Sequence, residues 1–153
     1  MLYSKSAEYA IQAMIYLAEK NSPKPTMVSE IAEAYAIPQQ FLAKIAQILS
    51  KHQLLIAIRG RNGGVRLGRP ANEIFLDQIV YVVDGPQQPE ARCVIGLDKC
   101  SDEAPCPLHH KWKVIREDIR DMLVAENLET LAKRVIDKRK LMKEVGLAAL
   151  VSD

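Results

Sequence analysis

The 153-residue sequence predicts a mainly α-helical fold with one small β-hairpin, arranged as a winged helix-turn-helix domain followed by a long helix. Two observations predict the winged helix. A pair of short helical stretches is separated by a tight break, and a hairpin signal follows them directly. A third observation, an apolar stripe at helical spacing over residues 107–127, predicts the long helix.

The first helix is expected over about residues 5–20, where apolar residues recur at helical spacing until the stretch NSPKPT breaks the pattern. A second helix should begin at Val28–Ser29 with Ser29 as its N-cap. It should end near Ala36, because Pro38 disfavours helical geometry in the residue before it. The inward residues of these two helices are expected to be Ala7, Ile11, Met14, Ile15, Ala18, Ile31 and Tyr35.

The third helix should carry Pro38 in its first turn. Its inward stripe is expected to be Phe41, Leu42, Ile45, Ile48 and Leu49. The runs LLIAIRG and VRLG then flank the turn RNGG, which indicates a β-hairpin whose glycines supply positive φ angles. A fourth helix is expected over residues 73–84.

We divide the chain into four parts. Residues 1–84 form the winged helix, and residues 85–106 form a linker and a cysteine-rich loop. Residues 107–140 hold the long helix and a shorter packing helix that starts near Thr130. Residues 141–153 are expected to be a C-terminal tail.

Composition is that of an ordinary globular domain, since 48% hydrophobic residues can fill a core. No apolar run approaches the roughly 20 residues of a membrane-spanning helix, so no membrane partner is expected. The N-terminal stretch contains Glu8 and Glu19 and is typical of a folded helix, not a signal peptide. We therefore expect a cytoplasmic protein with reduced thiols. Nucleophile-elbow, P-loop and dinucleotide motifs are missing, so neither an enzyme nor a small-molecule substrate is expected.

Charge is unevenly distributed. The net charge is only +2, yet no Asp or Glu occurs between Ala34 and Asn72. The six basic residues of that window are Lys44, Lys51, Arg59, Arg61, Arg66 and Arg69. A stretch of one sign is typical of a surface that meets phosphate, although a solvated basic face has the same composition.

Polar residues on the third helix lie opposite its apolar stripe. Glutamine can pair with adenine in the major groove, and lysine meets phosphate or guanine. Arginine suits the narrow minor groove, and bare glycines let the backbone approach it closely. The candidate DNA contacts are Gln39, Gln40, Ala43, Lys44, Gln47 and Lys51 on the helix and Arg59, Arg61, Asn62, Gly63, Gly64 and Arg66 in the hairpin. The alternatives are that the helix face is merely polar and that the hairpin turn is merely a turn. The polar face, however, follows a tight break and precedes a basic hairpin, and this order favours double-stranded promoter DNA as the partner.

One such motif covers few base pairs, and operators are usually read by symmetric dimers. The long helix offers a seam for a homodimer, because its stripe is broad enough to cover its own domain and a partner helix. The alternative is that it only completes the core of one chain. The seam candidates are Leu108, Trp112, Ile115, Ile119, Met122 and Leu123.

All three cysteines lie in one stretch, Cys93-x6-Cys100-x5-Cys106, and His109 follows closely. Thiolates in one short loop can converge on an inorganic centre, and the positive end of the following helix would stabilise its negative charge. Structural zinc sites normally contain tight Cys-x2–4-Cys knuckles, whereas iron–sulfur clusters accept wider spacings. The spacing favours a cluster. Zinc, a reactive thiol set and three structural cysteines are the alternatives.

Several separate stretches resemble one known family, the IscR/NsrR-type (Rrf-two) winged-helix regulators, which sense through an iron–sulfur cluster. The stretches are LYSKSAEYAIQAMIYLA, VSEIAEAYAIPQQFLAKIAQIL, IRGRNGGVRLGRP, IVYVVDG, ARC, CPLHHKW and LETLAKRV, which span nearly the whole chain. The resemblance implies a dimeric DNA-binding repressor associated with the bacterial nucleoid. It also implies that a cluster, 2Fe-2S in preference to 4Fe-4S, switches DNA affinity in response to redox state, nitric oxide or iron supply.

The resemblance further implies the ligands. The cluster would be bound by Cys93, Cys100 and Cys106, with His109 favoured as the fourth ligand over Glu8 from the partner subunit. The sequence departs from IscR-type members at two places. Six residues separate the first two cysteines, where IscR-type members commonly have five. Ala43 stands where they carry a glutamate that helps to select the DNA site, so the operator sequence cannot be inferred from theirs. A winged-helix regulator using zinc or thiols, and an iron–sulfur or protein-interaction module that does not bind DNA, remain the alternatives.

Overall fold

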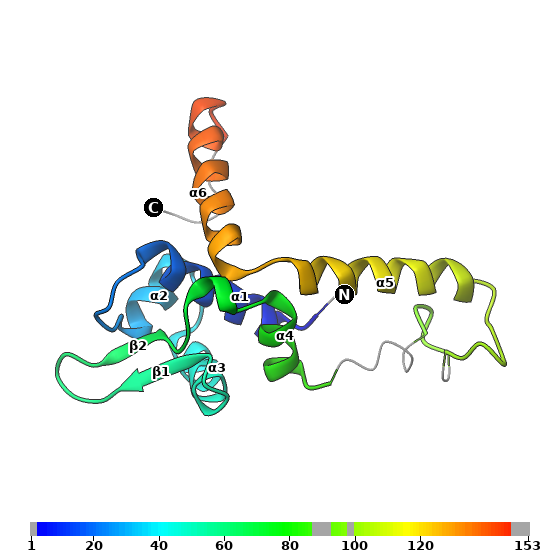
Figure 1. The fold of residues 1–153 in the computed structure, drawn as a ribbon, viewed down its shortest axis with the longest axis horizontal. Coiled ribbons are helices and arrows are strands. Elements are labelled where there is room, and N and C mark those ends of the chain that lie inside the picture. Colours follow the sequence, from blue (N-terminus) through cyan, green and yellow to red (C-terminus); the bar gives the residue numbers. More distant parts are fainter. Residues whose placement is uncertain (1–2, 87–92, 98–99, 148–153) are drawn as a thin grey trace.

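The computed structural model describes residues 3–86, 93–97 and 100–147. Over these residues it contains six α-helices and one two-stranded antiparallel sheet, which confirms the predicted fold class (Figure 1). The elements are α1 (Lys5–Lys20), α2 (Val28–Ala34), α3 (Gln39–Lys51), β1 (Leu55–Ile58), β2 (Gly64–Leu67), the 3₁₀ turn η1 (Ala71–Glu73), α4 (Leu76–Asp84), α5 (His109–Ala125) and α6 (Leu128–Glu144). No helix among the described residues is both long and apolar enough to cross a membrane.

Helix α1 lies at the centre of the core, packed against α3, α4 and α6. The helix begins where the Ser4 Oγ accepts a hydrogen bond from the Ala7 amide, 3.1 Å away. The predicted inward stripe is buried except for Ala18, which is half-buried. Ala10 and Ala13 are buried as well, and such small side chains allow neighbouring elements to approach α1 closely.

The inward stripe of α3 differs from the prediction. Phe41 and Ile48 are 41% and 39% exposed, and Ala46 is buried in their place. The buried set Leu42, Ile45, Ala46 and Leu49 follows one narrow helical face. Phe41 and Ile48 fall beside that face, and Phe41 instead packs edge-on against the Tyr9 ring at 5.8 Å.

The ends of three helices also differ from the prediction. Met27, and not Ser29, is the N-cap of α2, because Thr26 pairs with Val65 through two 2.8 Å hydrogen bonds that keep the chain extended up to Met27. Tyr35 caps α2, so this helix is shorter than expected, and Pro38 precedes α3 as its N-cap. Helix α4 begins only at Leu76, after the 3₁₀ turn.

The hairpin is confirmed, with Leu55 paired with Leu67 and Ile58 with Gly64. Gly64 has φ +146°, and a Cβ there would lie 2.3 Å from the Thr26 carbonyl oxygen. A Cβ at Gly63 would lie 2.3 Å from the Ile58 carbonyl oxygen. Gly63 is therefore required by the hairpin itself, and Gly64 by the bridge that joins the hairpin to Thr26, whatever binds to it.

The C-terminal half contains two helices of equal length. Helix α6 begins with Asn127 as its N-cap and continues to Glu144, so it is longer than the predicted packing helix and includes the first residues of the expected tail. No glycine or proline interrupts this stretch before Gly146, which explains its length. The expected linker residues 87–92 and the tail residues 148–153 lie outside the described residues. Figure 1 shows α5 extending away from the winged helix and α6 rising in a different direction.

The α5–α6 junction is joined to the winged helix by a short β-bridge between Phe75 and Asn127. The Leu76 amide donates to the Glu126 carbonyl at 3.1 Å, and the Leu128 amide donates to the Ile74 carbonyl at 2.8 Å. Ile74 and Leu128 are fully buried. The end of α5 is thus anchored to the body that presents α3 and the hairpin.

Candidate functional site

The candidate DNA-contacting residues of α3 lie on one exposed face of the helix. Gln39, Gln40, Lys44, Gln47 and Lys51 are exposed, and Ala43 is half-buried between them. Within the described part of the chain, these side chains form no hydrogen bond or ion pair. They are therefore available to an external ligand.

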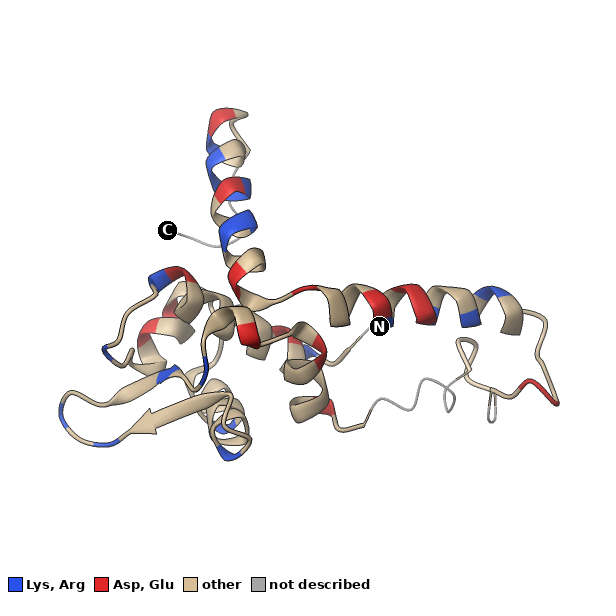
Figure 2. Cartoon of the chain, viewed as in Figure 1, with Lys and Arg blue, Asp and Glu red and all other residues tan. Residues whose placement is uncertain are grey.

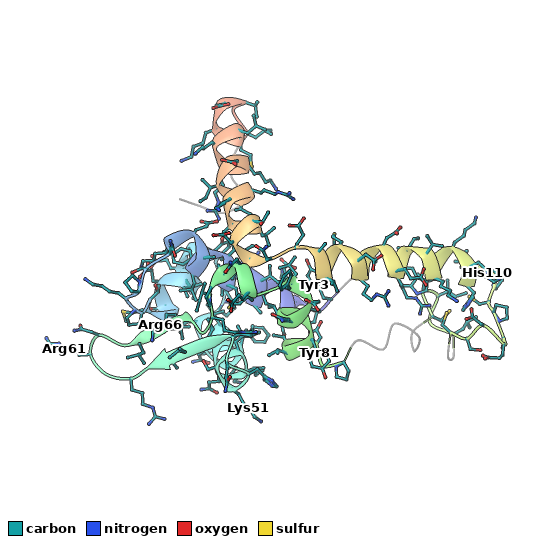
Figure 3. All side chains as sticks on the ribbon, viewed as in Figure 1. Tyr3, Lys51, Arg61, Arg66, Tyr81 and His110 are labelled. Atoms are coloured by element: carbon teal, nitrogen blue, oxygen red, sulfur yellow. The ribbon has the colours of Figure 1, made fainter. Side chains whose placement is uncertain are left out.

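The hairpin lies beside α3, and its strand β1 packs against that helix (Figure 1). Arg59, Arg61 and Arg66 are exposed, and Figure 3 places Arg61 at the hairpin tip and Arg66 nearer the body. Figure 2 shows only basic colouring on α3 and the hairpin, whereas α5 and α6 carry both signs. Arg69 differs from the others, because it is half-buried and its Nη2 lies 3.4 Å from the Gln78 Oε1.

The four candidate metal ligands of the C-terminal half meet in two pairs. The Sγ atoms of Cys93 and Cys106 lie 3.7 Å apart. The Cys100 Sγ lies 3.0 Å from the His109 Nδ1. Cys100 and His109 are 8% and 2% exposed, whereas Cys93 and Cys106 are half-buried. All three thiols are free.

A turn holds Cys93. The Gly96 amide donates to the Cys93 carbonyl at 3.0 Å, and Gly96 adopts φ +74°. Backbone hydrogen bonds, first from Ile95 and then from Leu97, lower the pKa of the Cys93 thiol, with a further contribution from Cys106. Amide donors of this kind stabilise a thiolate, which is the form that binds metals.

His109 is hydrogen-bonded on both sides of its ring. Opposite Cys100, its Nε2 lies 2.8 Å from the Asp102 Oδ1. Lys113 then approaches both oxygens of Asp102, at 2.9 and 3.1 Å. Lys113 and His109 together lower the pKa of Asp102 to about 2, so this carboxyl group is ionised at neutral pH.

Sequence reasoning missed Asp102 and Lys113. A signal for Lys113 existed, because residues four apart on a helix share a face and Lys113 follows His109 by four. Asp102 lies in an irregular loop, where spacing carries no comparable information. Its role emerges only from the path of the loop between Cys100 and Cys106.

Two further candidates lie apart from these pairs. The Glu8 carboxylate in the first turn of α1 pairs with the Lys5 Nζ at 2.6 Å. No hydrogen bond or ion pair between described residues joins Glu8 to the cysteine segment. His110 is exposed at the α5 end nearest the cysteines (Figure 3) and stacks edge-on with the His109 ring.

The predicted seam on α5 is largely uncovered in the single chain. Leu108, Ile115 and Met122 are 40%, 48% and 47% exposed, while Trp112 and Ile119 are half-buried. Leu123 belongs to the core of this chain. Val114 and Val124, which were not among the candidates, are about half exposed as well.

The donors fit an iron–sulfur cluster in chemical type. Two thiolates on one tetrahedral metal, each bound at about 2.3 Å, lie about 3.8 Å apart, close to the Cys93–Cys106 separation. Among the described residues, no three His, Cys, Asp or Glu side chains converge on one ion.

A helix-turn-helix with an exposed polar face, followed by an arginine-bearing hairpin, defines a winged-helix DNA-binding regulator. The particular family follows from comparison with known proteins: the Rrf2 model, described as "Iron-dependent Transcriptional regulator", matches residues 3–134. The chain belongs to the Rrf2 family and is a DNA-binding transcriptional regulator, not an enzyme.

Similar proteins support this assignment. The HTH-type transcriptional regulator NsrR of Oceanobacillus iheyensis is 30% identical over 146 residues, which cover 90% of this chain and 99% of the relative. CymR, the global cysteine regulator of B. subtilis, is 27% identical in sequence to this chain. Its solved structure matches with a TM-score of 0.72 and covers 86% of this chain and 95% of CymR. T. potens IscR, at 23% identity, shares the fold with TM-score 0.67 over 86% of each chain.

Proposed function

We propose that this Rrf2-family regulator is a homodimeric repressor of promoter DNA, located in the cytoplasm, whose DNA affinity is switched by an iron–sulfur cluster of the 2Fe-2S type. The pairing of Cys93 with Cys106 and of Cys100 with His109 carries the proposal. The family description and the similarity to NsrR support it. When bound, such a cluster supplies a centre that responds to redox state, nitric oxide or iron supply.

His109 is the fourth ligand in this proposal. Its ring is buried beside Cys100, and its Nδ1 is already within 3.0 Å of that sulfur. Glu8, by contrast, is engaged with Lys5. The two donor pairs would each bind one iron.

The DNA surface in this proposal combines the exposed face of α3 with the hairpin arginines. The α3 face offers glutamine amides and a small residue, Ala43, at the positions that would meet base edges. Arg59, Arg61 and Arg66 would meet the phosphates or the minor groove.

The exposed apolar face of α5 supports a homodimer, because solvent contact with Leu108, Ile115 and Met122 is unfavourable. The cysteine segment precedes α5, and the bridge between Phe75 and Asn127 joins its other end to the winged helix. A change in the packing of the cysteine segment would therefore shift α5 and the distance between two reading helices. Moving such an equilibrium from about 1:99 to 99:1 requires about 5.5 kcal/mol, a scale that metal–ligand bonding can supply.

The central test is anaerobic purification with iron and sulfide analysis and a visible spectrum. Equal amounts of iron and sulfide in the wild type, both lost when all three cysteines are changed to serine, are expected. His109→Ala should lower cluster content, whereas His110→Ala, its exposed neighbour, should not. A colourless protein that carries stoichiometric zinc after iron and sulfide are supplied would refute the cluster.

DNA occupancy tests the switch itself. Promoter binding by the wild type should change when the cluster is removed, and the three-serine variant should no longer show this change. Equal occupancy by the wild type and the variant under every condition would exclude control by these thiols.

A thiol-based regulator is the second candidate. Two free thiols 3.7 Å apart, those of Cys93 and Cys106, can be oxidised together to a disulfide. In this case DNA binding would respond to a thiol oxidant in protein that contains no iron. The iron-free wild type and its three-serine variant separate the two candidates.

A further inference from the structure

A four-residue hydrogen-bonded chain runs from the surface to the buried thiol. Lys113, 43% exposed, contacts both carboxylate oxygens of Asp102, and Asp102 contacts the His109 Nε2. His109 then reaches the Cys100 Sγ through Nδ1. One end of the chain is thus solvated, and the other ends at a candidate cluster ligand.

The donors and acceptors in this chain define where the His109 proton lies. An ionised carboxylate only accepts hydrogen bonds, and a lysine ammonium only donates them. Asp102, paired with Lys113, must therefore accept a hydrogen bond from the His109 Nε2–H, and the proton stays on the ring. In the neutral ring, the remaining lone pair is then on Nδ1, the nitrogen that faces Cys100.

We propose that Asp102, held by Lys113, is a positioning residue that fixes the tautomer and orientation of His109, so that Nδ1 is the atom that binds the cluster iron. This inference rests on the proposed function, in which His109 is a ligand. Metal-bound histidines usually donate their other ring N–H to such a partner, whose loss costs about 10–100-fold in metal affinity.

The contact serves orientation more than folding. Asp102 is 64% exposed, and exposed ion pairs contribute little to stability. Asp102 and Lys113 are also outside the main hydrophobic core. Removing Asp102 should therefore leave the fold intact and disturb the buried ring at the ligand site.

The experiment uses the full-length chain with Asp102→Ala and, as the matched control, Glu103→Ala, which removes the adjacent exposed acid. In the metal-free protein with ¹⁵N-labelled histidine, NMR should show His109 protonated on Nε2 in the wild type and in the control. In Asp102→Ala the population of this tautomer should fall. This measurement does not depend on a cluster.

The second measurement uses protein reconstituted anaerobically with ferrous iron and sulfide. Asp102→Ala should lose its cluster to EDTA about 10-fold faster or more, and Glu103→Ala at the wild-type rate. Lys113→Arg, which can still hold the carboxylate, should behave as wild type, and Lys113→Gln should fall between wild type and Asp102→Ala. If Asp102→Ala assembles no cluster, the comparison of Lys113→Arg with Lys113→Gln tests the positioning role.

The outcomes separate the two proposals. A wild type that assembles no cluster refutes the proposed function, while an unchanged tautomer in Asp102→Ala refutes the positioning role. A wild-type cluster that Asp102→Ala and Lys113→Gln retain as long as their controls refutes the positioning role alone. Nitrogen hyperfine coupling from Nε2 instead of Nδ1 in the reduced cluster also contradicts it.

Discussion

The hairpin arginines lead to a quantitative prediction about DNA affinity. Arg59 and Arg61 are exposed, and no ion pair within the described residues neutralises them. Changing both to glutamine should leave the free energy of unfolding within about 0.5 kcal/mol of the wild type. Their role should appear instead in the salt dependence of binding, because phosphate contacts release counterions.

The expected magnitude follows from the number of contacts. In a dimer, the double change removes four arginines. Each phosphate contact contributes about 0.9 to the slope of log affinity against log salt, so the slope should flatten by up to about 3.6. Between about 50 and 200 mM salt, the wild type should therefore lose about two decades more affinity than the variant.

Fluorescence anisotropy with a mixed-sequence duplex long enough for both protomers measures these slopes, because the electrostatic contribution does not require the operator. The control is Lys138→Gln with Lys140→Gln, the same charge change on exposed residues of α6. A slope for the arginine variant equal to that of the control would refute the assignment of the hairpin to DNA.

Three further predictions concern stability and thiol chemistry. Arg139→Met should lower the free energy of unfolding, measured in urea, by about 1–2 kcal/mol, because Arg139 contacts the 14%-exposed Glu19 at 2.6 Å and the Tyr35 hydroxyl at 2.8 Å. Arg134→Met, which removes a more exposed ion pair on the same helix, should lower it less, and an equal loss would contradict the argument. Hydrogen bonds from Lys20 and Tyr16 lower the pKa of Glu30, so its stabilisation is present above about pH 4.3 and is lost as the pH falls through the lowered pKa. Glu30→Gln should therefore show a flatter decline of urea-measured stability in acid, and a decline parallel to the wild type would exclude this contribution. In metal-free protein, the oxidant diamide should form a disulfide between Cys93 and Cys106 before any disulfide that includes Cys100, because Cys100 is buried against His109. If peptide mass mapping finds Cys100 in the first disulfide, the result would be incompatible with this geometry.

The sequence alone determined the order of helices and hairpin and the positions of most core residues of α1. These depend on local periodicity and on turn residues such as Gly63, where a Cβ would meet the carbonyl oxygen of nearby Ile58. It also indicated that the three cysteines and His109 belong to one site, because all four lie in the short segment from Cys93 to His109.

Only the tertiary structure decided the rest. The start of α2 depends on the bridge from Thr26 to Val65, and the exposure of Phe41 and Ile48 depends on which face of α3 the rest of the chain covers. The arrangement of the candidate ligands in two pairs and the contact of Asp102 with His109 depend on the path of an irregular loop. A local sequence pattern indicates which face of a helix or strand is apolar. Contacts across a loop depend instead on how the whole chain packs, and the spacing of residues within a short stretch does not carry that information.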